Sequence, residues 1–278
     1  MSDREGYCFL RGSCKVFCVP VFDANISLMF PDVPLLERFA AARACGFEGV
    51  EILNPYQASL RDLAARLKDN GLQLVLINTP MGDVAAGERG AGCLPGRESE
   101  FKKHFETALY YAVELGVGRI HVMAGVVPEE HKRRTCVETM VRNVQWAARL
   151  AAAEKIDLLL EPLNVRDVPG YLYATSEAAM DVITAIGEAN VKLQFDFYHV
   201  QIMEGDIGER ISTLFREIGH VQFSSVPGRY EPQYGEVNVY PLFEQLDALG
   251  YTGWVGCEYR PLGDTREGLS WAKCSDLG

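Results

Sequence analysis

The sequence has no apolar run of about 18 residues, roughly the shortest length that crosses a membrane as a helix. We therefore expect no membrane segment. Basic residues are also in the minority, because 27 Lys and Arg stand against 38 Asp and Glu and the formal net charge is -11. Proteins that bind nucleic acids normally present a basic face. The charge balance therefore argues against a nucleic-acid partner.

Paired metal-binding or redox cysteines are absent as well. The chain has 8 cysteines, but they are scattered and form no CxxC pair, so zinc-finger and thioredoxin-like motifs are missing. The chain is too large to need disulfides for its stability. We therefore expect a reducing, cytoplasmic environment.

The first 21 residues lack the cationic start and long apolar core of a secretory signal peptide. Asp3 and Glu5 are acidic, and Lys15 interrupts the weakly apolar stretch. We expect residues 1–21 to be a poorly ordered extension, with a targeting role as the alternative. No linker rich in Pro, Gly or Ser divides the rest, which predicts a single domain over residues 22–278.

Short runs with a strand pattern alternate with longer stretches of helical spacing. Strands are predicted at 22–27, 48–53, 72–77, 118–123, 156–161, 191–196, 218–223 and 253–258. Helices are predicted at 35–46, 59–71, 101–116, 138–154, 176–187 and 240–250. A doubly wound open sheet also alternates in this way. The count of eight strands, and the absence of GxGxxG after the first, favour a (β/α)8 TIM barrel.

Oxygen-bearing side chains stand at the ends of the last four predicted strands. They are Glu161, Asp196, Gln222 and Glu258. In a barrel these ends meet at one mouth, where chemistry gathers. Crowded carboxylates repel one another unless a cation or protons neutralise them, and an all-oxygen set suits Mg²⁺ or Mn²⁺. A carboxylate at a strand end can also cap a helix or pair with Lys or Arg, but four such ends together favour a site.

Other polar residues follow closely. His199 lies three residues after Asp196, and Arg229 follows the seventh predicted strand. His121 and His220 lie inside predicted strands and fit core histidines. The segment 78–97 is long and rich in glycine, which is typical of a mobile lid over a site.

Long segments in chain order resemble one known family. They include NTPMGDVAAGERGAGCLPGR, LLEPLNVRDVPGYL, QFDFYHVQIMEGD, GHVQFSSVPGRYEPQYGEVN and GYTGWVGCEYRPLGDTREGLSW. These segments resemble the hydroxypyruvate isomerases, and the resemblance extends from about residue 22 to residue 272. That family belongs to the xylose isomerase-like barrels, which include ketose 3-epimerases and endonuclease IV-type nucleases.

The resemblance implies roles for the residues at the strand ends. Glu161, in EPLN, and Glu258, in GCEYRP, match the two proton-transfer glutamates, which also bind the metal. Asp196 and Gln222 match the remaining metal ligands. His199 and Arg229 match positions that hold substrate oxygens in related epimerases. Gln222 departs from those epimerases, which have a histidine there.

The implied activity interconverts hydroxypyruvate and tartronate semialdehyde through an enediolate, on a small-molecule substrate of carbohydrate metabolism. The substrate carboxylate needs a cation, for which Arg229 is the first choice and Arg89 or Arg97 are the alternatives. A 2-oxotetronate isomerase or ketose 3-epimerase would use the same residues. An endonuclease IV-like metal-dependent nuclease and a sugar-binding protein without activity are the remaining alternatives. Apolar positions on the outer helices would support a homo-oligomer.

Overall fold

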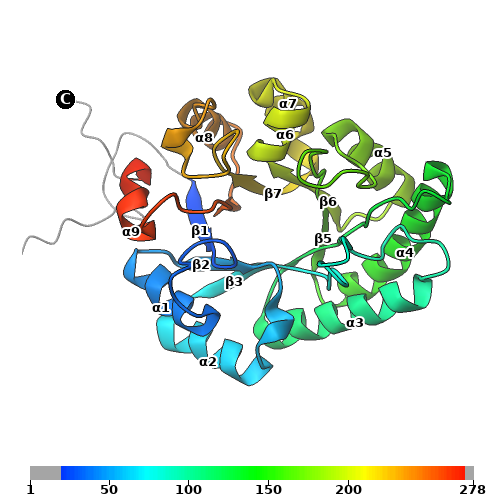
Figure 1. The fold of residues 1–278 in the computed structure, drawn as a ribbon, viewed down its shortest axis with the longest axis horizontal. Coiled ribbons are helices and arrows are strands. Elements are labelled where there is room, and N and C mark those ends of the chain that lie inside the picture. Colours follow the sequence, from blue (N-terminus) through cyan, green and yellow to red (C-terminus); the bar gives the residue numbers. More distant parts are fainter. Residues whose placement is uncertain (1–19, 273–278) are drawn as a thin grey trace, which may run out of the picture.

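The computed structural model describes residues 20–272, and its eight strands close into one barrel. All pairs are parallel, and β1 pairs with both β2 and β8 (Figure 1). The strands are β1 (Val21–Asn25), β2 (Gly49–Ile52), β3 (Gln73–Asn78), β4 (Arg119–His121), β5 (Asp157–Leu160), β6 (Val191–Asp196), β7 (Ile218–Phe223) and β8 (Trp254–Cys257). The predicted (β/α)8 barrel is confirmed. Most of the expected N-terminal extension lies outside the described residues.

Helices surround the barrel on its outer side (Figure 1). They are α1 (Leu35–Ala44), α2 (Leu60–Asn70), α3 (Glu98–Leu115), α4 (Arg133–Ala153), α5 (Ser176–Ile186), α6 (Phe197–Met203), α7 (Ile207–Leu214), α8 (Tyr240–Ala248) and α9 (Thr265–Gly268). Single 3-10 turns lie at η1 (Pro55–Gln57), η2 (Phe215–Glu217), η3 (Pro232–Tyr234) and η4 (Leu269–Ala272). No helix in the described part of the chain is long and apolar enough to cross a membrane.

Six of these helices match the predicted stretches, and α6, α7 and α9 do not correspond to any of them. The reason for α6 is visible in its sequence, FYHVQIM, where four successive residues from Phe197 to Val200 are buried. A helix buried on every side shows no alternation of apolar and polar faces. It starts instead from Asp196, whose Oδ1 accepts a hydrogen bond from the Tyr198 N–H (2.9 Å).

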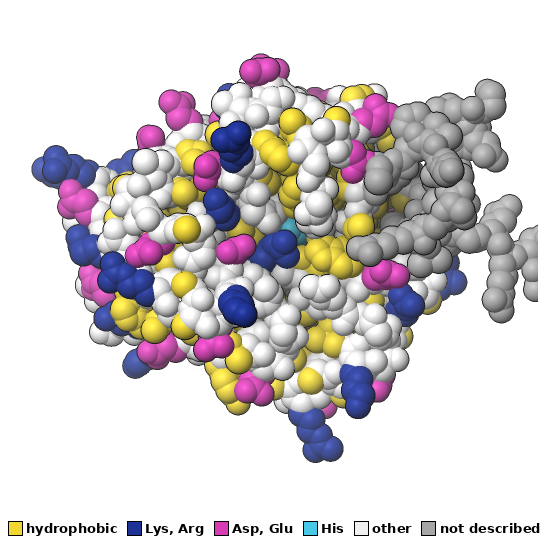
Figure 2. All heavy atoms as spheres, turned by 180° about the vertical axis from the view of Figure 1, so that it is seen from behind, with side chains coloured by type: hydrophobic (Ala, Val, Ile, Leu, Met, Phe, Trp, Pro, Cys, Tyr) yellow, Lys and Arg dark blue, Asp and Glu magenta, His cyan; other side chains and the backbone are white. Residues whose placement is uncertain are grey.

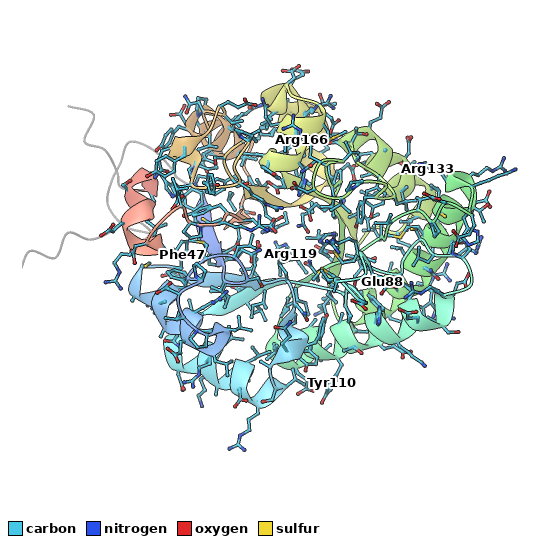
Figure 3. All side chains as sticks on the ribbon, viewed as in Figure 1. Phe47, Glu88, Tyr110, Arg119, Arg133 and Arg166 are labelled. Atoms are coloured by element: carbon cyan, nitrogen blue, oxygen red, sulfur yellow. The ribbon has the colours of Figure 1, made fainter. Side chains whose placement is uncertain are left out.

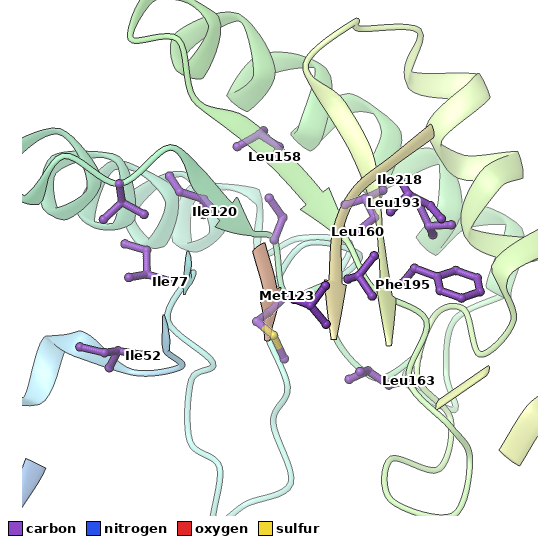
Figure 4. Close-up of a cluster of buried hydrophobic side chains, with 14 of the residues drawn as sticks. Ile52, Ile77, Ile120, Met123, Leu158, Leu160, Leu163, Leu193, Phe195 and Ile218 are labelled. Carbon is purple, nitrogen blue, oxygen red and sulfur yellow. The ribbon is translucent and has the colours of Figure 1, made fainter. Parts of the chain in front are cut away.

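The apolar core lies between the barrel and the helices. Leu158 and Leu160 on β5 meet Leu193 and Phe195 on β6 there (Figure 4). Burying one such side chain stabilises the fold by about 1.5–3 kcal/mol. Because side chains alternate along a strand, the residues between them point into the barrel. This alternation directs Glu161, Gln194 and Asp196 inward.

The lower part of the barrel interior is closed by packing. Val75, Leu76 and Leu159 form a separate small cluster, against which Trp254 packs. Arg119, at the start of β4, lies near the centre of the view in Figure 3. Its Nε donates across the barrel to the Gly219 carbonyl on β7 (3.0 Å). This packing closes the barrel at the end where the strands begin. The polar side chains inside the barrel therefore face the carboxyl ends of the strands.

Candidate active site

The four expected strand-end residues lie at the barrel mouth, and all are nearly buried. Asp196 ends β6 and Gln222 is the penultimate residue of β7. Glu161 and Glu258 lie one residue beyond β5 and β8, rather than inside them as predicted. Their exposed fractions are at most 4%. The barrel therefore gathers three carboxyl groups and one amide in a volume with little water.

Arg229 lies between two of these carboxyl groups. Its Nη2 is 3.2 Å from Glu258 Oε1 and 3.4 Å from Asp196 Oδ2. Its guanidinium carbon lies 4.8 Å from the centre of the Tyr198 ring. The other terminal nitrogen, Nη1, approaches Asp167 Oδ2 only to 3.9 Å, beyond hydrogen-bond range. One nitrogen therefore holds two carboxylates, and the other can donate to a further acceptor.

The backbone of Arg229 is unusual for a residue with a side chain. Its φ is 55°, in the left-handed region. Two hydrogen bonds hold it there: its N–H donates to the Ser225 carbonyl (2.8 Å), and its carbonyl accepts from the Arg260 N–H (2.9 Å). Backbone strain of this kind gathers at functional sites, where the surrounding structure imposes it. The loop after β7 thus fixes the direction of the guanidinium.

His199 is held as a neutral ring of defined tautomer. The backbone N–H of Asn164 donates to His199 Nδ1 (3.0 Å). Since Nδ1 accepts, the proton of the neutral ring is on Nε2. This Nε2 has no hydrogen-bond partner and lies 3.7 Å from both Glu161 Oε1 and Asp196 Oδ2. Burial and the nearby Arg229 charge lower the pKa of His199 well below its usual value. His199 therefore presents a donor to the mouth, in place of a lone pair.

Burial disfavours charge on the acidic groups. It raises the pKa of Asp196 to about 6 and that of Glu258 to about 8, against the opposing effect of Arg229. The pKa of Glu161 is raised well above its usual value by burial and then by the charges of Glu258 and Asp196. Carboxyl groups with pKa values of about 6 and about 8, as for Asp196 and Glu258, exchange protons near neutral pH, as an acid–base site requires.

Three further side chains at the site escaped the sequence interpretation, or were taken for core residues. Gln194 Nε2 donates to Glu161 Oε2 (3.1 Å) and to Gln222 Oε1 (2.6 Å). Glu51 on β2 accepts from Gln222 Nε2 (2.7 Å). His121 Nδ1 lies 3.3 Å from Glu161 Oε2. The sequence does contain a signal for these residues: each is a polar residue among apolar ones in a predicted strand. In a closed barrel, one of the two faces of such a strand points into the barrel.

The donor set fits a hard divalent cation. Glu161 Oε1 and Glu258 Oε2 are buried without any hydrogen-bond partner. Ligand atoms of Glu161, Asp196 and His199 lie within 4.8 Å of one another. Carboxylate and amide oxygens are the ligands that Mg²⁺ and Mn²⁺ prefer. Because the Nε2 of His199 carries a proton, the oxygens are the atoms that could hold such a cation.

The segment expected to form a lid is anchored over much of its length. Cys93 N–H donates to the Ala124 carbonyl (2.7 Å), and Asn143 on α4 donates to the Gly92 carbonyl (2.9 Å). Arg97 forms ion pairs with Glu88 and Glu100, each at 2.6 Å. Residues 82–87 are exposed. Arg97 is thus committed to surface carboxylates, which leaves Arg229 as the better-placed cation.

A closed parallel barrel with buried carboxyl groups at its mouth is an arrangement found in enzymes, whose catalytic residues stand at the carboxyl ends of the strands. The chain belongs to the xylose isomerase-like TIM barrel family, whose model matches residues 39–274. A 2-oxo-tetronate isomerase from Cupriavidus necator is 47% identical over 92% of this chain and 98% of its own length. The hydroxypyruvate isomerase of Escherichia coli is 40% identical over 90% of this chain and 97% of its own.

A solved structure from Brucella melitensis has a closely similar fold. It is described as an AP endonuclease of family 2 and is 45% identical in sequence. The two superpose with a TM-score of 0.89 over 91% of this chain and 97% of that chain. The similarity to the Escherichia coli enzyme confirms the resemblance to the hydroxypyruvate isomerases, and the fold similarity to the Brucella melitensis structure extends over 91% of this chain.

Proposed function

We propose that this protein is an isomerase of short 2-oxo acids that interconverts hydroxypyruvate and tartronate semialdehyde. One observation carries the proposal. Glu161 and Glu258 each have one oxygen held by a nitrogen donor and one buried oxygen without a partner. Two such carboxyl groups at one mouth provide an acceptor and a donor for a single mobile proton. The activity named for the Escherichia coli relative supports the choice of substrate.

The reaction moves a carbonyl group between C2 and C3. One glutamate removes a proton from C3 of hydroxypyruvate, which gives an enediolate, and a proton is returned at C2. The hydroxyl and carbonyl oxygens exchange one proton in the same sequence, so the atoms balance. Positioned general bases and acids accelerate such steps by about 10²–10⁴-fold. Glu161 Oε1 and Glu258 Oε2 are the atoms free to carry these protons.

His199 and Arg229 bind the substrate oxygens. The Nε2–H of His199 is a neutral donor, suited to a carbonyl oxygen that gains negative charge. Arg229 Nη1 is suited to the substrate carboxylate, since Nη2 is already bound to Asp196 and Glu258. A divalent cation held by Glu161, Asp196, Gln222 and Glu258 would act as a Lewis acid toward the substrate oxygens.

A second candidate substrate is 2-oxotetronate, which is one carbon longer. The 47% identical relative from Cupriavidus necator is named for it, and that identity exceeds the 40% to the Escherichia coli enzyme. The same carboxyl groups would act on both substrates. The exposed residues 82–87 of the loop after β3 are a region where the two specificities could differ.

The nuclease reading has less support from this chain, although the Brucella melitensis protein carries such a name. Nucleases of the endonuclease IV type use a zinc cluster with several histidines. Among the described residues at the mouth, only His121 and His199 are histidines, and the chain carries a net charge of -11. Figure 2 shows acidic and basic side chains interspersed over one face of the molecule.

Among the described residues, Cys45, Cys93, Cys136 and Cys257 form no disulfide, which supports a cytoplasmic location.

Proton NMR in D₂O tests the function. With purified protein, hydroxypyruvate should incorporate deuterium at C3 and convert to tartronate semialdehyde. Parallel reactions with 2-oxotetronate and with a ketose rank the candidate substrates by kcat/KM. No exchange into any of the three, combined with cleavage of DNA containing abasic sites, would replace the isomerase proposal by the nuclease.

Removal of divalent cations gives a separate prediction. Dialysis against EDTA should abolish conversion, and Mg²⁺ or Mn²⁺ should restore it, because the buried carboxyl groups lose the charge that balances them. Calcium serves as the control cation, since it prefers a larger coordination shell. Full activity in protein shown by elemental analysis to be free of metal would contradict this prediction.

A further inference from the structure

Four polar side chains form a hydrogen-bonded chain beneath the mouth. Gln194 Nε2 donates to Glu161 Oε2 and to Gln222 Oε1, and Gln222 Nε2 donates to Glu51 Oε2. The three distances are 3.1, 2.6 and 2.7 Å. All four residues are nearly or fully buried. The chain therefore links β2, β7 and β6 to the glutamate next to β5.

The direction of this chain is set at Glu51. Glu51 Oε2 also accepts from Asn25 Nδ2 (3.2 Å), and Glu51 Oε1 is hydrogen-bonded to His220 Nε2. An amide N–H can only donate, so an oxygen facing two amide nitrogens must accept. The nitrogen of Gln222 is therefore held on the side of Glu51. The oxygen of Gln222 must then face Gln194, whose Nε2 donates a hydrogen bond to it.

The barrel leaves room for this arrangement at one glycine. A Cβ at Gly256 on β8 would lie 2.4 Å from Glu51 Oε1 and 2.9 Å from Gln222 Cγ. Asp23, Glu51 and His220 also place ligand atoms within 4.8 Å of one another. Since Glu51 already accepts from two amide nitrogens and is hydrogen-bonded to His220 Nε2, we assign it to hydrogen bonding, in preference to a second cation site.

We propose that Glu51 is a positioning residue. It fixes the orientation of the Gln222 amide and, through Gln194, determines which oxygen of Glu161 is available for proton transfer. The proposal rests on the proposed function of Glu161. Both N–H bonds of the Gln194 amide are used, one on Gln222 and one on Glu161 Oε2. Oε2 is thereby held in place, and Oε1 is the atom left for the reaction. The amide of Gln222 needs such a partner, because it can otherwise rotate by half a turn and exchange its oxygen and nitrogen.

The first test uses the unmodified protein. Protein labelled with ¹⁵N in glutamine side chains should give a Gln222 NH₂ pair that is dispersed and exchanges slowly with D₂O, because this amide is buried and bound to Glu51. The pair is identified by its loss in Gln222→Glu. Exchange as fast as that of an exposed glutamine would overturn the proposal, whether or not any variant folds.

The second test is Glu51→Gln, with Glu231→Gln as the matched control. Glu231 is equally buried, but its Oε2 accepts from the backbone N–H of Leu262 (3.1 Å). In Glu51→Gln the Gln222 signals should shift and kcat should fall about 10- to 100-fold, with KM changing less, as expected when an aligned group is misplaced. Glu231→Gln should leave both unchanged. A Glu51→Gln variant with a lower melting temperature but normal kcat and Gln222 signals would reduce Glu51 to a structural role and overturn the proposal.

The two proposals fail differently. If the unmodified protein turns over none of the candidate substrates, the proposed function is wrong. The shift of the Gln222 signals in Glu51→Gln would still support the positioning role. If turnover occurs but the Gln222 signals do not respond to residue 51, the function stands and Glu51 is not the positioning residue.

Discussion

Glu161→Gln and Glu258→Gln should each abolish isomerisation while each keeps a different half of the proton exchange. The glutamate that remains can still remove and return the proton on its own side of the substrate. In D₂O one variant should therefore exchange C3 of hydroxypyruvate without conversion, and the other should exchange C2 of tartronate semialdehyde. Conversion should fall by about 10²–10⁴-fold or more, the range for loss of a positioned general base.

Both variants should keep the fold, which makes the kinetic loss interpretable. Burial raises the pKa of such a carboxyl group in the folded protein. At pH values above the group's pKa in the unfolded chain, the group therefore lowers the stability of the folded state. Replacing Glu161 by a neutral amide of the same shape should therefore not lower the melting temperature at neutral pH. Glu188→Gln is the control, because the Glu188 carboxylate pairs with Arg149 at the surface (3.1 Å), away from the barrel mouth. Near-normal conversion in both variants would exclude the two-glutamate assignment.

The sequence predicted the parts of this site that depend on local pattern. Strands predicted at 191–196 and 218–223 have the same bounds as β6 and β7. The strand-end residues followed from these bounds. Asp196 and Gln222 therefore lie opposite each other in the β6–β7 register, as a barrel mouth requires.

The parts that were missed depend on contacts across the barrel. Glu51 is one of two acidic residues in the predicted strand EGVEIL (48–53), a pattern that fits a half-exposed strand as well as a buried one. Only barrel closure places it against His220 and Gln222, which lie 169 and 171 residues away. The same holds for the different contacts of the two terminal nitrogens of Arg229. The partners of Nη2 come from β6 and from the residue after β8.

Arg229→Lys should damage both substrate binding and the alignment of the acids. A lysine ammonium has a single nitrogen, so it cannot take the place of Nη2 between Asp196 and Glu258 and also direct a second donor nitrogen at a substrate carboxylate. We expect kcat/KM to fall about 100-fold, equivalent to about 2.8 kcal/mol at roughly 1.4 kcal/mol per tenfold. The loss should appear in KM, because the free Nη1 is assigned to the substrate, and in kcat, because Glu258 loses a fixed partner.

Arg97→Lys is the matched control for that experiment. Arg97 is also held by two carboxylates, but these are Glu88 and Glu100 on the surface. Its replacement should leave KM and kcat unchanged. If KM rises for Arg97→Lys and stays normal for Arg229→Lys, the binding site of the substrate carboxylate would be assigned to Arg97, in the loop after β3. An increase in kcat alone for Arg229→Lys would mean that the guanidinium restrains the acids more than it aligns them.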